Sequence, residues 1–175
     1  ERVHLETEAS KLAYNARNLF IGDPDYMQRE INTFFDDKSS SNLANLIDLK
    51  KASPNLKSQT EEVHLDTVLV TVVDKHRCAV SLIFSIFHAF GSGHSSEKYG
   101  LLFQNRGAGF TLEKDHPNEL IGNKRPLHTI IPAMVKRNGE LMMAYGVMGG
   151  QYQPAGHVRI LSNIIDYGLN IQDSI

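Results

Sequence analysis

The sequence has few of the residues and segments that mark several large classes of protein. Its 175 residues include one cysteine, Cys78, so no internal disulfide can form, which fits a reducing compartment and favours a cytoplasmic location. No secretory signal is visible, and no apolar run approaches the ~18–20 residues that a membrane span needs. The formal net charge of −2 and the lack of a basic stripe argue against a nucleic-acid partner.

Sequence patterns of metal and cofactor sites are also missing. The eight histidines include no HExxH motif, and a single cysteine cannot build a zinc site. His88 and His94 flank the sequence FGSG at residues 90–93, which is too short to form a phosphate-binding loop. We therefore expect the protein to work without a metal and without a cofactor.

The composition is that of an ordinary globular domain, with 41% hydrophobic and 22% charged residues, and its character changes near residue 66. Before this point, apolar residues recur at three- and four-residue steps over 5–20. This spacing predicts a helix, which Gly22 and Pro24 end. The other elements expected in this part are short helices at 27–35 and 40–48 and an exposed polar linker at 51–62.

Beyond residue 66 the sequence alternates between strand-like runs and turns. Residues 68–73 and 79–84 have the composition of buried strands and predict a hairpin. Residues 130–135 and 140–146 predict a second hairpin, because Asn138-Gly139 between them is a strong turn signal. A short strand is expected at 100–105 and a loop at 111–126.

The last segment predicts a helix. Apolar residues of HVRILSNIIDYG (157–168) fall on one helical face, and Gly168 closes the helix. The face consists of Val158, Leu161, Ile164 and Ile165.

The junction between the two parts, Asp66-Thr67, places a hydroxyl at the entrance of the first strand. If the chain is cut before Thr67, its new α-amine, with a pKa of about 7.7–8.0, can take the hydroxyl proton and create a nucleophile. The same hydroxyl could make the cut by attacking the Asp66 carbonyl and forming an ester. Threonine is common in strands, so spacing alone favours a simple strand start.

Two further stretches carry groups that suit catalysis or binding. In GVMGG (146–150), backbone N–H groups of adjacent glycines before a helix could hold a developing oxyanion. A plain strand-to-helix turn is the simpler interpretation of that stretch. In NKRPLHT (123–129), His128 and Thr129 could donate hydrogen bonds to a substrate, whereas we expect Arg125 to brace the loop through an acid or backbone carbonyls.

A polar patch, Gln104, Asn105 and Arg106, follows the apolar run of LLFQNRGAGF. Arg106 could bind a substrate carboxylate through two parallel hydrogen bonds. A surface arginine without such a role is equally consistent with the sequence.

Together these stretches resemble the γ-glutamyltranspeptidase family of N-terminal nucleophile hydrolases. EASKLAYNARNLFIGDPDY is similar to the helix at the end of that family's large subunit, and DTVLVTVVD to the segment around its processing site. AVSLIFSIFHAFGSG, YGLLFQNR, NKRPLHTIIPAMV and GVMGG, followed by DYGLNIQ, match in order. Seven such stretches in sequence are a far more specific signal than any one of them.

The resemblance implies an α/β fold of the layered αββα type, of which this chain holds only a part, and self-cleavage into a heterodimer. Residues 1–66 would be the helical end of the large subunit with the linker to the processing site. Residues 67–175 would be the first part of the small, catalytic subunit. The implied partners are the remainder of both subunits and a small-molecule amide such as glutathione, with no nucleic acid and no membrane span in this chain.

The resemblance also implies roles for single residues. Thr67 matches the family nucleophile, and Ser85 matches a threonine whose hydroxyl supports that nucleophile. Gly149 and Gly150 match the glycines of the oxyanion hole. The residues implied to bind substrate are Asn105, Arg106, His128 and Thr129, the last two of which fall on a pair of serines.

The sequence departs from the family pattern around the implied site. TVL (67–69) stands where the family has Thr-Thr-His, and Phe87 replaces an asparagine near the nucleophile. Gly109 stands where an acidic residue grips the α-amino group of the γ-glutamyl moiety, and Arg106 replaces glutamine or glutamate. Since the site loses its partner for an ammonium group and gains a cation, we expect weakened γ-glutamyl affinity. A dicarboxylic acyl group bound by Arg106 is one candidate substrate.

We therefore predict a γ-glutamyltranspeptidase-like amidohydrolase or acyltransferase that cleaves itself before Thr67. It would pass a γ-glutamyl or related acyl group from an amide to water or an amine. A glutaryl- or cephalosporin-type acylase is an alternative that shares the mechanism and differs in the acyl pocket. A catalytically inactive relative, kept as a scaffold or binding protein, is a second alternative, which Phe87 and Gly109 favour.

Overall fold

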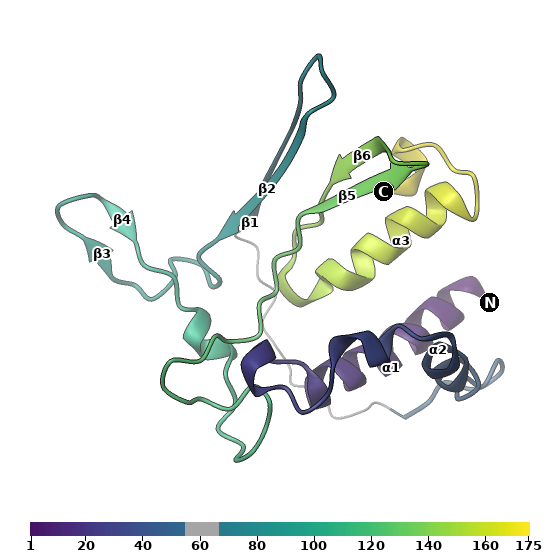
Figure 1. The fold of residues 1–175 in the computed structure, drawn as a ribbon, viewed down its shortest axis with the longest axis horizontal. Helices are drawn as coiled ribbons and strands as arrows, with labels where there is room; N and C mark the ends of the chain where they lie inside the picture. The colour runs from purple at the N-terminus through teal and green to yellow at the C-terminus, as the bar shows by residue number, and fades with distance from the viewer. Residues whose placement is uncertain (55–66) are drawn as a thin grey trace. The chain divides into compact units, whose positions relative to one another are not determined.

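The computed structural model describes residues 1–54 and 67–175 (Figure 1). Asp66, which precedes the bond predicted to be cut, and linker residues 55–62 lie outside the described residues. No helix within the described ranges is long and apolar enough to span a membrane.

The described residues pack as two compact units. One holds residues 1–54 with Gly109–Leu127, and the other holds residues 67–108 with 128–175. The chain thus returns to the first unit after entering the second. The division predicted at residue 66 is a covalent cut, not a boundary between packed units. It stays a prediction, because the two packed units do not show where the chain is cleaved.

The first unit begins with the predicted N-terminal helix. The helix, α1 (Arg2–Phe20), starts before the expected Leu5 and ends where Ile21 turns to an extended conformation. A 3-10 turn, η1 (Pro24–Tyr26), follows, and the side chain of Asp23 caps it. The predicted helix stop is confirmed, because proline cannot continue an α-helix.

Two short helical segments follow, as predicted in kind but shifted in position. The first, η2 (Ile31–Phe34), is a single 3-10 turn. The second, α2 (Asp37–Ala44), starts before the expected residue 40. Its start is set by Asp36, whose carboxylate accepts the Ser39 N–H at 2.6 Å and satisfies one of the free donors of the first turn.

Residues Gly109–Leu127 complete the first unit as the predicted loop. His116 Nε2 donates to the Asn18 carbonyl oxygen, at 2.7 Å, near the end of α1. Close by, the Pro117 carbonyl oxygen would lie only 2.3 Å from a Cβ placed on Gly22. Only glycine allows this approach, so Gly22 both follows the helix end and admits the loop.

The loop is also tied to η1 by Arg125. Its backbone N–H and Nε donate to Asp23 Oδ2 at 2.8 and 3.0 Å, and its guanidinium lies 3.2 Å from Asp25 Oδ2. These hydrogen bonds hold the pKa of the Asp23 carboxyl far below its usual value, and the same pair raises the pKa of Arg125. The bracing role predicted for Arg125 is confirmed.

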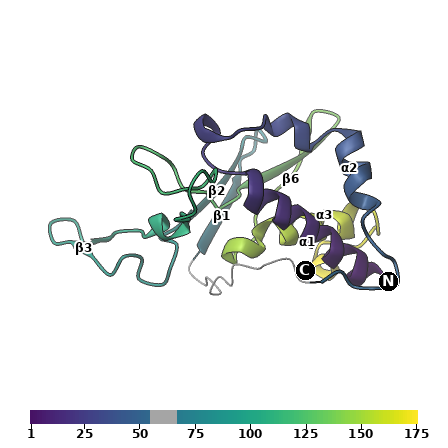
Figure 2. The same cartoon turned by 90° about the horizontal axis from the view of Figure 1, so that it is seen from below.

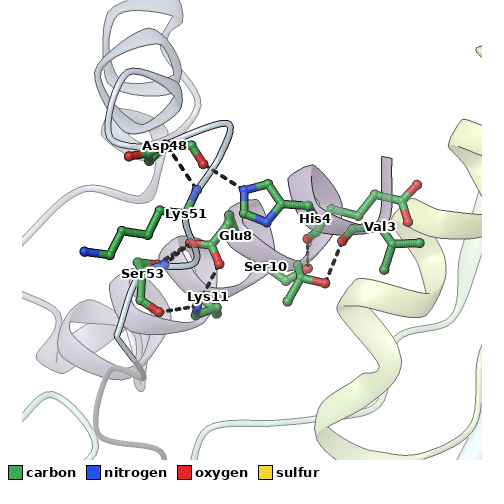
Figure 3. A network of polar contacts seen from close by, with 10 residues as sticks. Val3, His4, Glu8, Ser10, Lys11, Asp48, Lys51 and Ser53 are labelled. Carbon is green, nitrogen blue, oxygen red and sulfur yellow. Dashed lines mark hydrogen bonds and ion pairs between the residues drawn. The ribbon is translucent and has the colours of Figure 1, made fainter. Parts of the chain in front are cut away.

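A second polar network of this unit is built on Glu8, which is buried in α1 (Figure 3). Its carboxylate accepts from Lys11 Nζ at 2.7 Å and from the backbone N–H of Ser53 at 3.1 Å, and it also accepts from the Ser53 hydroxyl. Lys11 closes the network by donating to the Ser53 carbonyl at 2.7 Å. The Lys11 and Ser53 side chains are the main causes that lower the pKa of Glu8 to about 2.

The second unit opens with the predicted first hairpin. Strands β1 (Thr67–Val73) and β2 (Ala79–Ser85) pair antiparallel, with Thr67 opposite Ser85. Asp74 organises the turn, because one of its carboxylate oxygens accepts two backbone N–H groups of the turn at 2.8 Å each.

The second predicted hairpin is also present. Strands β5 (Ala133–Arg137) and β6 (Glu140–Tyr145) are joined through Asn138 and Gly139, whose φ angles are 52° and 85°. Positive φ at both positions is what a two-residue type I′ turn requires. The predicted strand at 100–105 is shorter, since only β4 (Leu101–Leu102) pairs, with β3 (Ser95–Ser96).

The strand β6 lies beside the first hairpin (Figure 2). The Ser81 hydroxyl of β2 donates to the Tyr145 carbonyl at 3.1 Å, and the Arg77 guanidinium donates to the Leu141 carbonyl. Side-chain donors thus join two hairpins that share no backbone ladder.

The C-terminal helix, α3 (Gln153–Ile165), packs on the β5–β6 hairpin (Figure 1). Gln153 Oε1 accepts the Ile131 N–H at 2.9 Å, just before β5, and the His157 ring lies 4.7 Å from the Tyr145 ring between centroids. The helix starts before the predicted residue 157, since a proline in its first turn suits a helix start.

The buried face of α3 differs from the predicted one. Val158 and Ile165 are 65% and 52% exposed, whereas Gln153, His157 and Asn163 are buried. Asn163 Nδ2 donates to the Ser174 carbonyl at 3.0 Å, and Gln153 Oε1 accepts the Ile131 N–H just before β5. Polar side chains therefore join the helix to neighbouring backbone groups, whereas of the predicted apolar face Val158 and Ile165 are exposed and Leu161 and Ile164 are half-buried.

The first hairpin, expected to be buried, is largely exposed in this chain. Val68 and Val70 of β1 are 46% and 43% exposed, and Leu82 and Phe84 of β2 are each 54% exposed. A two-stranded sheet has no second layer of its own, so the side chains that β6 does not cover meet solvent. The described residues thus form part of a layered fold.

We expect Glu8→Gln to destabilise the protein at neutral pH and to reduce its sensitivity to acid. The folded pKa of Glu8 is lowered from 4.5 to about 2, so its stabilising effect is present above the unfolded pKa and is lost as pH falls through the folded pKa. Urea unfolding at a series of pH values should show a lower midpoint at pH 7 and a shallower loss of stability below about pH 4.5.

The matched control is Glu6→Gln, since Glu6 pairs with Arg2 on the helix surface at 29% side-chain exposure. It should leave both quantities nearly unchanged, because exposed pairs contribute little. Equal effects of the two substitutions would show that the Ser53 network does not stabilise the fold.

Candidate active site

Thr67, the predicted nucleophile, is the first residue of β1 and is only 6% exposed. Ser85 is its partner across the ladder, so the two hydroxyl side chains point to the same face of the hairpin. Cβ atoms of directly opposed residues lie about 4.5–5.5 Å apart. The structure therefore brings these two predicted site residues together, although no direct hydrogen bond joins their hydroxyls within the described contacts.

The chain turns sharply after Ser85. Its hydroxyl oxygen accepts the Phe87 N–H at 3.0 Å, which leaves the hydroxyl hydrogen available for donation. Phe87 is buried and has a φ of 81°, a region that bulky residues seldom adopt. Backbone strain of this kind persists where surrounding contacts hold it, and here the ring stacks on His88 with 4.8 Å between centroids.

Arg106 reaches the same strand end from η3 (Arg106–Gly109). It is 9% exposed, and its Nη2 donates to the Ser85 carbonyl at 3.3 Å. Its Nη1 donates to Thr129 Oγ1 at 3.4 Å, and its guanidinium carbon lies 5.4 Å from the Phe87 ring centroid. Burial lowers the pKa of Arg106, and no carboxylate in residues 1–54 or 67–175 forms an ion pair with it.

The adjacent residues His128 and Thr129 differ in environment. Thr129 is buried and faces Arg106, as its hydrogen bond shows. His128 is exposed as a whole, yet partial desolvation and then the charge of Arg106 lower the pKa of its ring. His128 is therefore neutral near pH 7 and adds no charge to the site.

Asn105, predicted to bind substrate, has its amide engaged within the protein. Its Oδ1 accepts the His88 N–H at 3.0 Å, and its Nδ2 lies 2.6 Å from His88 Nδ1. These contacts fix the turn that carries Phe87. The structure therefore assigns Asn105 a bracing contact, and its substrate role stays a prediction.

The GVMGG turn (146–150) joins β6 to α3 through η4 (Gly150–Tyr152). Gly149 and Gly150 have φ angles of 123° and 53°, which favour glycine. Within the described contacts, neither glycine N–H donates to a protein group. In the part of the chain that the structure describes, the turn thus leaves two N–H donors without an acceptor, the arrangement that an oxyanion hole needs.

The position of this turn relative to Thr67 follows from Leu69. A Cβ on Gly146 would lie 2.8 Å from a methyl carbon of Leu69, so the start of the turn rests on that side chain. Thr67 and Leu69 are two residues apart in one strand and face the same side. The turn therefore begins on the face of β1 that carries the Thr67 hydroxyl.

The sequence analysis did not predict the burial of Gln153 or the side-chain partner of His88. Gln153 is fully buried beside the GVMGG turn, and its Nε2 has no hydrogen-bond partner among the described residues. A polar residue at the start of a helix gives no sign of such burial. The partner of His88 is seventeen residues away in the sequence, so no local pattern indicates it.

No group of three or more His, Cys, Asp or Glu side chains that could hold a metal ion occurs in the described ranges. The site as described consists of hydroxyls, one guanidinium and backbone donors.

Comparison with known proteins identifies the family of this chain. Residues 1–175 match the family described as Gamma-glutamyltranspeptidase. The chain therefore belongs to the gamma-glutamyltranspeptidase family, and the resemblance seen in the sequence is confirmed.

Two of the similar proteins each align with 100% of this chain. It is 37% identical over 175 residues to "Oxamate amidohydrolase proenzyme" of Klebsiella pneumoniae subsp. pneumoniae. It is 33% identical over 175 residues to "Glutathione hydrolase-like YwrD proenzyme" of Bacillus subtilis. In both comparisons the chain spans 33% of the relative's length.

A solved structure shares the fold. The crystal structure of cephalosporin acylase from Bacillus halodurans superposes with a TM-score of 0.83 at 31% identity, over 96% of this chain and 30% of that chain. This likeness confirms the predicted fold class, of which the present chain holds a part.

We expect the pKa of His128 to rise when Arg106 is replaced by methionine. The substitution removes a positive charge that disfavours the protonated ring, so the pKa should move toward 6.5, the ordinary value of histidine. NMR titration of carbon-13-labelled histidine rings measures this shift directly. His157, whose pKa is lowered mainly by burial, should not respond, and an unchanged His128 would show that the two groups are not coupled.

Proposed function

We propose that the protein to which this chain belongs is an amidohydrolase or acyltransferase that cleaves itself before Thr67 and then uses that residue as its nucleophile. The observation that carries this proposal is the buried Thr67 at the start of β1, opposite Ser85 and on the face where GVMGG begins. Family membership supports the reaction class. The two relatives described as proenzymes support self-processing.

Self-cleavage would use the Thr67 hydroxyl. Its oxygen attacks the Asp66 carbonyl carbon, the C–N bond breaks, and an ester forms while the nitrogen of Thr67 becomes a free amine. Water then attacks the ester, which releases the Asp66 carboxylate and restores the hydroxyl. The Ser85 hydroxyl, with its hydrogen free for donation, is placed to support the Thr67 oxygen during these steps.

Turnover would repeat this chemistry on a substrate amide. The α-amine of Thr67 takes the hydroxyl proton, the oxygen attacks the amide carbonyl, and the N–H groups of Gly149 and Gly150 stabilise the oxyanion. The proton passes to the leaving amine, and an acyl ester remains. Water or an acceptor amine then attacks this ester and gives a proton to the α-amine, which passes it to the departing Thr67 oxygen as the C–O bond breaks and the acid or the new amide is released.

In this proposal residues 1–66 end the large subunit and residues 67–175 begin the small one. The remaining parts of both subunits complete the layered fold. They would cover the apolar side chains that β1 and β2 leave exposed here.

Two alternatives share this fold. An acylase with another acyl group is favoured by Arg106, a buried cation where the family carries glutamine or glutamate. A catalytically inactive relative is favoured by Phe87 and Gly109. Cleavage before Thr67 distinguishes these hypotheses: it should occur in the proposed enzyme and in an acylase, and it should be absent from an inactive relative.

We expect the full-length protein to yield a fragment that begins Thr67-Val68-Leu69, and we expect Thr67→Ala to stay whole. Alanine removes the oxygen that must attack the preceding carbonyl. Intact-mass spectrometry with N-terminal sequencing measures the product. Thr71→Ala is the matched control, because Thr71 lies exposed in the same strand, and it should process normally.

Equal processing of the Thr67→Ala variant would point to cleavage by another protease. If the unmutated, folded protein stays whole, the inactive relative is the better interpretation.

We also expect Gly149→Ala to slow self-cleavage or turnover by up to about 10²–10³-fold, the usual effect of losing one oxyanion donor, because alanine keeps the N–H but is strained at this φ, so the backbone should shift and turn the donor away. The nearest atom to an added Cβ is 3.6 Å away, so the space is free and the strain comes from a φ of 123°. The rate of release of p-nitroaniline from acyl anilides, together with the rate of fragment formation, measures the effect. Gly122→Ala, at a position with open space and no positive φ, should match the unmutated protein.

A further inference from the structure

We propose that Arg106 binds a carboxylate on the acyl part of the substrate, so that the donor is a monoamide of a short dicarboxylic acid without an α-ammonium group. This inference rests on the proposed function, since it names the substrate class of the same site. It concerns recognition and adds no chemical step.

Arg106 is a buried cation, 9% exposed, without a carboxylate partner among the described residues. The only cause that shifts its pKa is burial, which is what a guanidinium without a nearby anion shows. Buried charges in proteins are paired as a rule, so an unpaired one beside a nucleophile calls for an anionic ligand.

The protein contacts of Arg106 leave donors free. A guanidinium has five N–H groups in a planar fork, and the described bonds use two of them at 3.3 and 3.4 Å. Both acceptors, the Ser85 carbonyl and the Thr129 hydroxyl, are neutral. A carboxylate would offer shorter, charge-assisted bonds and could be held by two of them at once.

The location of the guanidinium suits the acyl group of a Thr67 substrate. Its Nη2 bonds to the carbonyl of Ser85, and Ser85 is the ladder partner of Thr67. The charge is therefore anchored to the residue that faces the nucleophile. An acyl chain attached to Thr67 needs only a few carbons to bring a terminal carboxylate to this position.

The neighbours of Arg106 select against an ammonium group. Within the described ranges no carboxylate pairs with Arg106, and the Phe87 ring, whose face would attract a cation, is already in contact with the guanidinium, at 5.4 Å from its centroid. A γ-glutamyl donor carries an α-ammonium beside its carboxylate. That ammonium would sit close to Arg106, and like charges in a desolvated site repel.

A structural role is the competing explanation for Arg106. In that case the guanidinium only ties the Ser85 carbonyl to Thr129, and its loss would weaken turnover of every substrate equally. A binding role predicts a change confined to substrates that carry a carboxylate, seen in KM more than in kcat. The ratio between substrates therefore separates the two roles.

The test uses the full-length processed protein and three p-nitroanilides: glutaryl, which has a carboxylate, butyryl, which has none, and γ-glutamyl, which adds the ammonium. We expect kcat/KM for glutaryl to exceed both others by at least about 10-fold, the scale of one hydrogen-bonded charge. Arg106→Gln should reduce the glutaryl-to-butyryl ratio at least about 10-fold. Arg106→Lys should retain part of it, because the charge remains.

The control variant is Arg159→Gln, an exposed arginine of α3 that should leave all three rates unchanged. Equal losses on glutaryl and butyryl anilides in Arg106→Gln would overturn the inference while leaving the nucleophile proposal standing. A preference for γ-glutamyl over glutaryl in the unmutated protein would overturn it as well.

The proposed function would be refuted if the protein neither cleaved itself nor turned over any anilide. In that case a second measurement, of binding alone, still tests whether Arg106 is a carboxylate site. Calorimetric titration with glutaramate should then still show tighter binding than butyramide, and Arg106→Gln should abolish the difference. No difference between the two amides in the unmutated protein would show that Arg106 is not a carboxylate site.

Discussion

The site depends on the register of one antiparallel ladder. Thr67 faces Ser85 only while β1 and β2 pair as they do, because a slip of one residue would turn every side chain of the strand to the opposite face. Within β1 the alternation of side chains puts Leu69 on the Thr67 face, and Leu69 lies against Gly146, so the glycine turn begins on that face. Thr67, Ser85 and the two glycines, for which we propose catalytic roles, are therefore positioned by the backbone more than by direct contacts among themselves.

The guanidinium of Arg106 is a charge placed inside this framework, with no carboxylate partner in residues 1–54 and 67–175. Desolvation makes it costly, and two long bonds to neutral oxygens offset only part of that cost. An anion that binds to the guanidinium reduces this cost. The free energy that favours binding of a carboxylate therefore also stabilises the folded protein. Partial desolvation and then the charge of Arg106 lower the pKa of His128, so this ring adds no second cation near the guanidinium at neutral pH.

The sequence predicted the elements whose signals are local. Asn138-Gly139 fixed the second hairpin through its turn, and the helix stop at Pro24 needed no distant partner. Burial was predicted poorly, because the exposure of Val158 depends on which elements cover α3. Among long-range pairs, Arg125 was expected to brace its loop but its acid was unknown, and nothing local indicates that Glu8 would bind Ser53, forty-five residues later.

Family membership and substrate class rest on different parts of the molecule. The roles that we propose for Thr67 and the glycine pair depend on backbone geometry, which tolerates few side-chain changes: at Gly149 a positive φ, not lack of space, excludes other residues. Phe87 and Arg106 are held by side-chain contacts, so they can depart from the family pattern that the resemblance implies without disturbing the ladder. A chain that kept the proposed nucleophile and glycine pair could therefore change its substrate class by exchanging the charge beside them.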